Sequence, residues 1–159
     1  MNNGIKAVLV TSSSLYHLDT NIVIAYLNGN QDIADKLKAH LLHIAISSLV
    51  LGELLYGARA SQRQDENVEK IYQFLYIVQV VDFNQASAEQ YSHIRVYLRK
   101  KGHPTGEVDA LIAAIAIAHN AILVTDNVKH FQHIEELTVA NWVVQLVSGF
   151  YGLKHLVGD

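Results

Sequence analysis

Short apolar runs alternate along the chain with longer stretches in which apolar residues recur every three or four positions. The short runs predict β-strands and the longer stretches predict helices. The predicted strands are Leu15–Leu18, His43–Ser47, Ile77–Phe83, Ala121–Thr125 and Trp142–Val147. The predicted helices are Thr20–Leu27, Asp32–His40, Ser48–Ala60, Glu66–Leu75, Ala86–Lys100 and Glu107–His119. Strands that alternate with helices favour an α/β fold with a mainly parallel sheet.

The helix predicted at Glu107–His119 is apolar on all sides, which predicts a buried position between other elements. Thr105 is a suitable cap for its start, and Asp109 then falls in the first turn, where the helix dipole favours a negative charge. A purely structural role at the helix end is therefore one interpretation of Asp109. Another helix is expected to begin after Asn84, whose side-chain oxygen can accept from a free backbone N–H group.

Composition bounds the number of domains. The chain has 159 residues, of which 50% are hydrophobic and 17% are charged, so it can bury a core and is far from the composition of a disordered chain. The length suits one domain. We place this domain at residues 15–147, with an N-terminal extension at residues 1–14 and a C-terminal tail at residues 148–159.

Charge and cysteine content exclude several classes of function. The net charge of −3 excludes a broad basic surface that holds duplex DNA through its phosphates alone, so any nucleic acid must be bound locally. Without cysteine the chain can form no disulfide, thiolate zinc site or cysteine nucleophile, and we expect a cytoplasmic location. The longest apolar stretch, Ala110–Ala118, is well short of the roughly 20 residues of a membrane-spanning helix. We therefore expect a soluble protein with no membrane partner.

Acidic residues occur where the predicted strands end. Asp19 follows the first strand and Asp126 follows the fourth. Glu53 lies in the helix after the second strand, where its leucine neighbours predict a position beside apolar surface rather than on a plainly solvated face. Asp109 opens the helix that leads into the fourth strand. Ligands of open parallel sheets bind beyond the carboxyl ends of the strands, so we expect these acids to share one edge of the sheet.

Each acid also has a structural interpretation: Asp19 as a helix cap, Glu53 as an exposed helix residue and Asp126 as a turn former. Their agreement on one edge favours a site. Like charges that lie close together need a cation, and without one at least one carboxyl should have a raised pKa. Oxygen ligands without cysteine suit Mg²⁺ or Mn²⁺.

Four segments of the chain carry a resemblance to a known family. They are HLDTN at 17–21, ISSLVLGELLYGA at 46–58, GEVDALIAAIA at 106–116 and LVTDNVKHF at 123–131. In this order and spacing they resemble the motifs of PIN-domain ribonucleases, especially the VapC-type toxins of bacterial toxin–antitoxin pairs. The resemblance runs from about Leu15 to Trp142. It implies a PIN-like three-layer domain with a mainly parallel five-stranded sheet flanked by helices.

The resemblance also implies roles for individual residues. The implied metal-binding acids are Asp19, Glu53 and Asp109. The implied polar supports are Asn21, Ser48 and Thr125. Many family members carry a fourth acid two positions after the threonine, and here that position is Asn127, preceded by Asp126. The fourth catalytic position therefore stays open between these two residues.

The resemblance implies hydrolysis of RNA phosphodiester bonds by water on Mg²⁺ or Mn²⁺. Asp19 and Asp109 would hold the principal ion, and Glu53 would bind it or orient its water. Candidate phosphate contacts, which can also serve only to solvate helices, are Arg59, Arg63, Arg95, Arg99, Lys100 and Lys101. His103, beside this basic patch, could contact phosphate, although an ordinary surface position is the commoner fate of such a residue.

The implied partners are an RNA substrate, a cognate antitoxin that blocks the site with a peptide or an arginine, and a second copy of the chain in a homodimer. Apolar residues that could line a groove for a protein partner, or pack in the core, are Ile22, Ile24, Leu27, Leu54 and Leu55. The alternative function is a catalytically weak PIN-like module that binds RNA or protein without cutting.

Overall fold

A five-stranded parallel sheet lies at the centre of the structure, a computed structural model that describes residues 14–143 except residue 104. Its strands are β1 (Leu15–Leu18), β2 (Ile44–Ser47), β3 (Gln79–Val81), β4 (Ala121–Val124) and β5 (Thr138–Ala140). The order across the sheet is β3, β2, β1, β4, β5, and every neighbouring pair is parallel. The α/β class and the parallel sheet are thus confirmed.

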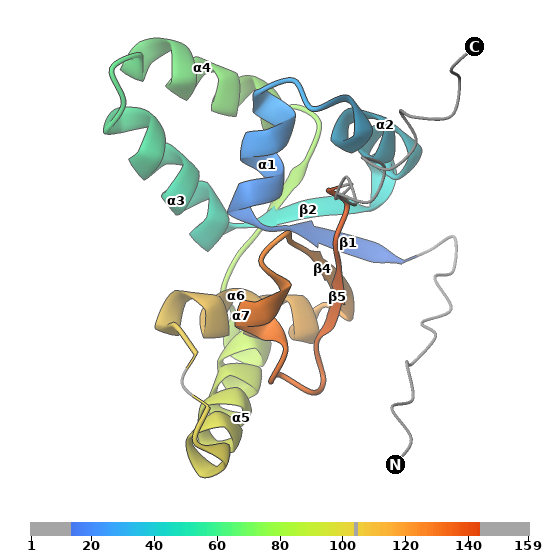
Figure 1. Ribbon diagram of the computed structural model, residues 1–159, viewed down its shortest axis with the longest axis vertical. Coiled ribbons are helices and arrows are strands. Elements are labelled where there is room, and N and C mark those ends of the chain that lie inside the picture. The colour runs from blue at the N-terminus through green and yellow to red at the C-terminus, as the bar shows by residue number, and fades with distance from the viewer. Residues whose placement is uncertain (1–13, 104, 144–159) are drawn as a thin grey trace, which may run out of the picture.

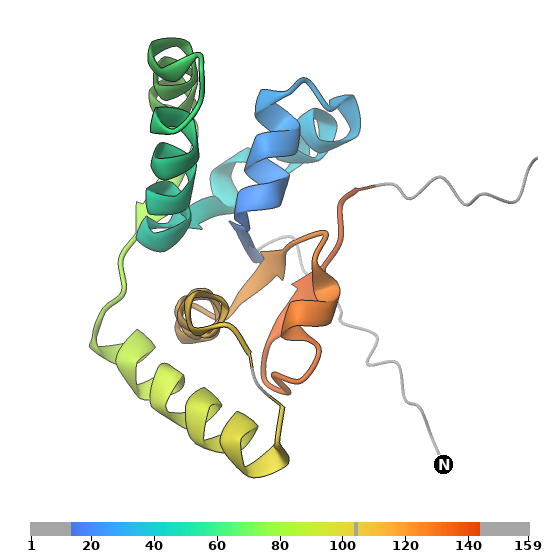
Figure 2. The ribbon, with the colours of Figure 1, turned by 60° about the vertical axis from the view of Figure 1, so that its left-hand side comes forward.

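Helices cover both faces of this sheet. They are α1 (Thr20–Leu27), α2 (Gln31–Ala39), α3 (Ser48–Arg59), α4 (Gln64–Phe74), α5 (Gln85–Lys101), α6 (Glu107–Ala118) and α7 (Val128–Phe131), with a 3₁₀ turn at Leu41–His43. Helices α1 to α4 lie on one side and α5 to α7 on the other, which gives three layers (Figures 1 and 2). No helix in the described part of the chain is long and apolar enough to cross a membrane.

The predicted last strand, Trp142–Val147, is wrong at its first two residues. The strand that completes the sheet is β5, whereas Trp142 and Val143 come after it and residues 144–147 lie outside the described part. Trp142 is buried because its ring packs 5.2 Å from the ring of Tyr16 and 5.7 Å from that of His40, and not because it belongs to a strand. The predicted extension at residues 1–14, of which only Ser14 is described, and the tail at residues 148–159 also lie outside.

Helix α6 is buried as its all-round apolar sequence predicts. It contacts α5, β4, α3 and α7, and Ala113, Ala114 and Ile115 have no exposed surface. Alanine side chains allow this close approach on several sides. The predicted cap is wrong, because the cap residue is Gly106 and not Thr105, and no side chain caps the helix. The cap at Asn84 is confirmed, since its side chain accepts from the backbone N–H of Ser87 at 3.0 Å.

The strand order reverses between β1 and β4. The chain leaves β1 toward β2 and β3 on one side of the sheet, and β4 and β5 lie on the other. The carboxyl ends of β1 and β4 are held together by a hydrogen bond of 2.9 Å from Asp19 N to Val124 O. Open parallel sheets bind ligands at such a reversal. The residues that follow these two strands are therefore the first place to look for a site.

Candidate active site at the carboxyl edge of the sheet

Asp19 is the most firmly held acid at this edge. It caps α1, and its side chain is buried, with 7% of the residue exposed. Its Oδ1 accepts from the backbone N–H of Thr20 at 2.8 Å, and its Oδ2 accepts from Thr125 Oγ1, also at 2.8 Å. The structural interpretation as a cap is therefore correct, but it accounts for only one of the two oxygens.

Thr125 and Asn21 support the second oxygen. The Nδ2 of Asn21 donates to Thr125 Oγ1 at 3.1 Å and lies 3.3 Å from Asp19 Oδ2. Thr125 is fully buried, and its Oγ1 also accepts from the backbone N–H of Asn127 at 3.1 Å. The Oδ1 of Asn21 accepts from the backbone N–H of Asp126 at 3.1 Å. One network thus joins the end of β1 to the loop after β4.

The electrostatic state of Asp19 reflects this position. Burial raises the pKa of its carboxyl above the ordinary value, while hydrogen bonds from Thr125 and Thr20 lower that pKa in part. The negative charges of Glu53 and Asp109 raise it further. The expected raised carboxyl pKa is confirmed, but the largest cause is burial and repulsion comes after it.

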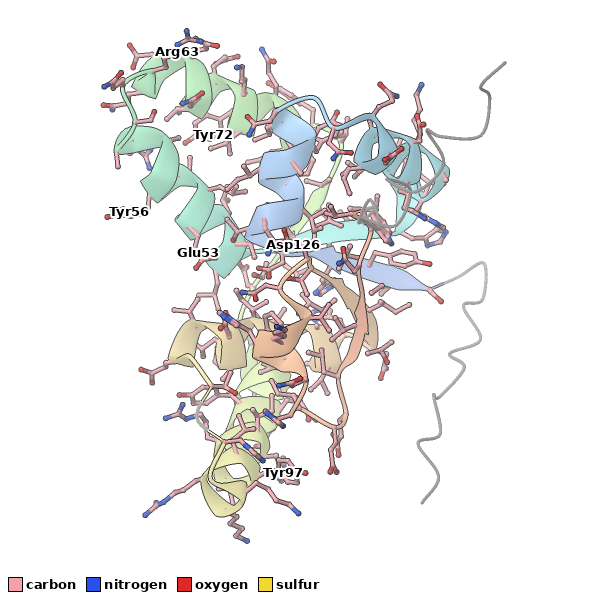
Figure 3. All side chains as sticks on the ribbon, in the orientation of Figure 1. Glu53, Tyr56, Arg63, Tyr72, Tyr97 and Asp126 are labelled. Carbon is pink, nitrogen blue, oxygen red and sulfur yellow. The ribbon has the colours of Figure 1, made fainter. Side chains whose placement is uncertain are left out.

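Glu53 reaches the edge from α3. Its Oε2 accepts from the hydroxyl of Thr20, the residue after Asp19, at 2.5 Å. The expectation that Glu53 avoids a solvated face is wrong, because the residue is exposed. Its leucine neighbours point elsewhere, and Leu54 is buried in the core. Figure 3 shows Glu53 on the half of α3 that lies toward the middle of the molecule.

Asp109 lies in the first turn of α6 with 27% of its side chain exposed. Its Oδ2 lies 3.0 Å from Nδ1 of His130, which stands on α7. A Cβ on Gly106 would come within 3.1 Å of the same oxygen, so glycine leaves room for the carboxylate. Sequence reasoning did not place His130 at the site, although the residue belongs to the segment LVTDNVKHF.

The loop after β4 carries both candidates for the fourth catalytic position, and their surroundings differ. Asp126 is exposed, and its carboxylate is not among the charges that raise the pKa of Asp19. Asn127 is half-buried and joins the network through its backbone only. The other support, Ser48, is the first residue of α3 and has no side-chain hydrogen bond to any described residue. Its neighbour Ser47 is buried and caps α3 by accepting from Val50 N at 3.1 Å.

The cations that sequence reasoning assigned to phosphate are all exposed and lie outside the acid network. The side chain of Arg63 is 76% exposed and stands 3.8 Å from Glu66. Arg59 lies at the end of α3, and the remaining cations lie on the C-terminal half of α5, namely Arg95, Arg99, Lys100 and Lys101. The structure therefore divides them between two separate regions.

The donor set suits a hydrated hard cation rather than a closed metal site. Among the described residues, no three His, Asp or Glu side chains converge as metal ligands. Mg²⁺ is commonly held by one or two carboxylates, several waters and substrate phosphate oxygens. Asp19, with Glu53 and Asp109 acting on its charge, offers such carboxylates. The residues present therefore fit Mg²⁺ or Mn²⁺ in this open arrangement.

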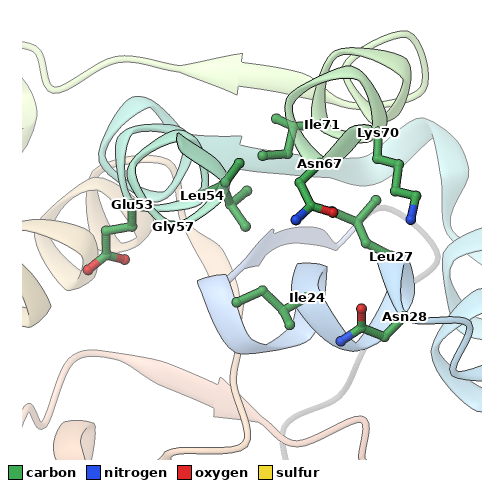
Figure 4. Close-up of a pocket in the computed structure, with 10 residues that line it drawn as sticks. Ile24, Leu27, Asn28, Glu53, Leu54, Gly57, Asn67, Lys70 and Ile71 are labelled. Carbon is green, nitrogen blue, oxygen red and sulfur yellow. The ribbon is translucent and has the colours of Figure 1, made fainter. Parts of the chain in front are cut away.

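A groove of about 280 Å³ begins at Glu53 and runs between α1, α3 and α4 (Figure 4). Its apolar lining includes Ile24, Leu27 and Leu54. Of the other residues considered for such a groove, Ile22 is fully buried in the core. The groove therefore joins an apolar surface to one member of the acid cluster.

Comparisons with known proteins agree on a family. The model of the PIN domain family matches residues 16–137. Ribonuclease VapC2 of Rickettsia felis is 40% identical over 131 residues, which are 80% of this chain and 98% of that protein. The tRNA(fMet)-specific endonuclease VapC of Shigella flexneri is 33% identical over 128 residues, covering 80% of this chain and 97% of that protein.

Solved structures give the same result. The structure of VapBC2 from Rickettsia felis bound to a promoter DNA fragment has a TM-score of 0.77 and 38% identity, and the match covers 81% of this chain and 99% of that one. DNA-bound VapBC from Salmonella typhimurium has a TM-score of 0.78 and 29% identity, and the match covers 82% and 99% of the two chains.

Proposed function

The chain belongs to the PIN-domain family, as one of its VapC-type ribonucleases, and we propose that it is a divalent-metal-dependent endoribonuclease that serves as the toxin of a toxin–antitoxin pair in the cytoplasm. The observation that carries the metal-dependent reaction is the buried carboxylate of Asp19. Thr125 and Asn21 hold it at the reversal of strand order, and the charges of Glu53 and Asp109 act on it.

Each residue of the edge has a definable task. Asp19 and Asp109 are the carboxylates that would hold the principal ion, and Glu53 would bind it or orient a water. When bound, Mg²⁺ or Mn²⁺ lowers the pKa of a water molecule and neutralises phosphate charge. Thr125 and Asn21 fix the orientation of Asp19, and the hydroxyl of Thr20 orients Glu53. His130 holds the carboxylate of Asp109 in place.

The antitoxin is the proposed protein partner, and the groove between α1, α3 and α4 is its proposed seat. Apolar side chains of a peptide would cover Ile24 and Leu27, and a cationic side chain at the end of the groove would reach Glu53. The resemblance to VapC-type toxins also supports a homodimer, for which light scattering gives the mass in solution. Replacement of Leu27 by Asp should weaken antitoxin binding without abolishing RNA cleavage.

Cleavage in the presence and absence of metal tests the proposal. Purified protein should cut RNA with Mg²⁺ or Mn²⁺, should stop in excess chelator and should recover when Mn²⁺ is restored. tRNA(fMet) is one suitable substrate, because the VapC relative of Shigella flexneri is named as specific for it. Asp19→Asn should lower the rate by about 100-fold or more, whereas Asp32→Asn, an exposed acid on α2, should not change it. RNA binding without cleavage would favour the alternative binding module, and cleavage that persists in chelator would exclude the metal mechanism.

A further inference from the structure

A second hollow, of about 600 Å³, lies at the C-terminal end of α5 and is not part of the groove or the acid edge. Its polar lining consists of Arg95, Arg99, His103 and Thr105. Each of these side chains can donate a hydrogen bond, and none of the described residues that line the hollow carries a carboxylate. The lining is therefore built to accept negative charge.

The two arginines have no acidic partner. Neither Arg95 nor Arg99 forms an ion pair with any residue between 14 and 143, residue 104 aside. They are four residues apart on α5 and so share one face, an arrangement in which like charges destabilise a helix. Lys100 and Lys101 already complement the dipole at this end of α5. Helix stability therefore does not explain why both arginines face one hollow.

Gly102 and His103, the two residues that follow α5, have defined positions beside the hollow. Gly102 ends the helix in the left-handed conformation with a φ of 69°, and the backbone N–H of His103 donates to Leu98 O at 3.1 Å. The ring of His103 stacks on that of His133, with centroids 3.8 Å apart and planes 2° apart. His103 is thus held against the segment that follows α7 instead of turning freely in solvent.

The hollow is continuous along the chain with the acid edge. Thr105, which lines it, directly precedes Gly106, the cap residue of α6. Asp109 lies in the first turn of that helix. A single strand of nucleic acid whose phosphate lies at the acid edge can therefore continue past the start of α6 toward α5.

We propose that this hollow binds a backbone phosphate of the RNA substrate, outside the phosphodiester that is cleaved. This inference rests on the ribonuclease function proposed above. Guanidinium groups match phosphate oxygens with two parallel hydrogen bonds, and His103 and Thr105 supply further donors. RNA suits the hollow better than an acidic peptide because one polymer reaches both the hollow and the acid edge. The hollow extends the binding site and so selects for substrates longer than the cleaved dinucleotide.

Substrate length gives the sharpest test. The double variant Arg95→Gln/Arg99→Gln is compared with wild type and with Lys36→Gln/Lys38→Gln, which removes the same charge from exposed positions on α2. Cleavage of an RNA ladder, from dinucleotides to a full tRNA, is measured for each protein with Mn²⁺. The arginine variant should lose kcat/KM on long substrates through a higher KM and should match wild type on the shortest RNA that is cut. The lysine variant should match wild type at every length.

Salt dependence supplies a second readout. Binding is measured on an Asp19→Asn background, in which cleavage is expected to be slow. The slope of log Kd against log salt for long single-stranded RNA should become shallower by about 0.7 for each phosphate that the arginine variant no longer neutralises. An equal reduction of kcat/KM at all lengths, an unchanged slope, or tighter binding of polyglutamate than of RNA by the wild-type protein would overturn the phosphate subsite. Failure of the proposed ribonuclease function would give a different result, because the wild-type protein would then cut no RNA of any length.

Discussion

The acid edge and the cationic end of α5 handle charge in opposite ways. Asp19 is 7% exposed, and both of its oxygens accept hydrogen bonds from the protein. Arg95 and Arg99 are exposed, with no carboxylate partner among the residues that the structure describes. The acid edge is therefore arranged by the fold before any ligand arrives. The guanidinium of Arg95 lies 6.0 Å from the ring centroid of Tyr91, but neither arginine has an anionic partner among the described residues until a ligand binds. Substitutions at the acid edge should change the chemistry itself, and those at the cationic end should produce graded, salt-dependent effects.

The largest expected effect on stability concerns His17, a buried group on β1 just before the acid edge. Burial, and then the charge of His119, lower the pKa of His17 to about 4 from its ordinary value of 6.5. The unfolded chain therefore binds a proton more tightly than the folded one, and stability present above pH 6.5 is lost as pH falls toward 4. The free energy of unfolding should fall by about 3 kcal/mol, because each unit of pKa shift corresponds to about 1.36 kcal/mol.

The variant His17→Phe isolates this effect. The Nδ1 of His17 has no hydrogen-bond partner among the described residues, so the substitution removes the titration without breaking a bond at that atom. Urea unfolding of both proteins from pH 4 to pH 7 should show a steeper loss of stability in acid for wild type. Asp19 acts in the opposite direction in both proteins, because its raised pKa favours folding at low pH. Parallel plots of the free energy of unfolding against pH for the two proteins would show that burial does not lower the pKa of His17.

Removing the hydroxyl of Thr125 should destabilise the acid edge. Thr125→Val keeps the shape of the buried side chain but removes the donor to Asp19 and the acceptor for Asn21. Stability should fall by about 1–3 kcal/mol, because buried polar groups lose their partners. The pKa of Asp19 should rise further, since the hydrogen bond from Thr125 lowers it. In a plot of cleavage rate against pH, the acid limb should then move to higher pH. An unchanged profile would show that the ionisation of Asp19 does not govern the rate.

A smaller effect is expected from Asp109→Asn. Without metal, this variant should be at least as stable as wild type, because one of the charges acting on Asp19 is gone. Wild type should gain about 1.4 kcal/mol at a free Mn²⁺ concentration ten times its Kd, and the variant should gain less. Thermal melts at neutral pH with and without Mn²⁺ compare the two. A metal-free variant much less stable than wild type, with an undiminished Mn²⁺ gain, would make Asp109 a structural residue of the helix start.

The parts of the fold that follow from local pattern could be predicted. Leu15–Leu18 and Thr20–Leu27 form a strand and a helix with the predicted bounds, because a buried apolar run is followed at once by a capping aspartate. The last strand could not be placed. Thr138–Ala140 is short and only half-buried, whereas the more apolar Trp142 is buried by ring packing outside the sheet.

The candidate site shows the same division. The proximity of Asp19 to Thr125 follows from two parallel strands that end side by side, which sequence patterns can indicate. The contact of His130 with Asp109 depends on how the short helix α7 packs near α6, and no periodic pattern encodes that packing. The exposure of Glu53 could not be predicted either, because the neighbouring leucines indicate only that their own face of the helix is buried. Sequence thus indicates which strand ends meet, and the side-chain partners require the packed structure.

Binding of Mn²⁺ to the protein without RNA tests the central claim most directly. Isothermal titration calorimetry compares wild type with Asp19→Asn and with Asp65→Asn, an exposed acid at the start of α4 that serves as the charge-matched control. If the acid edge holds the ion, Asp19→Asn should raise the Kd at least about 10-fold, a loss of about 1.4 kcal/mol, and Asp65→Asn should leave it unchanged. Equal Mn²⁺ affinity in all three proteins would contradict the assignment of the metal to this edge.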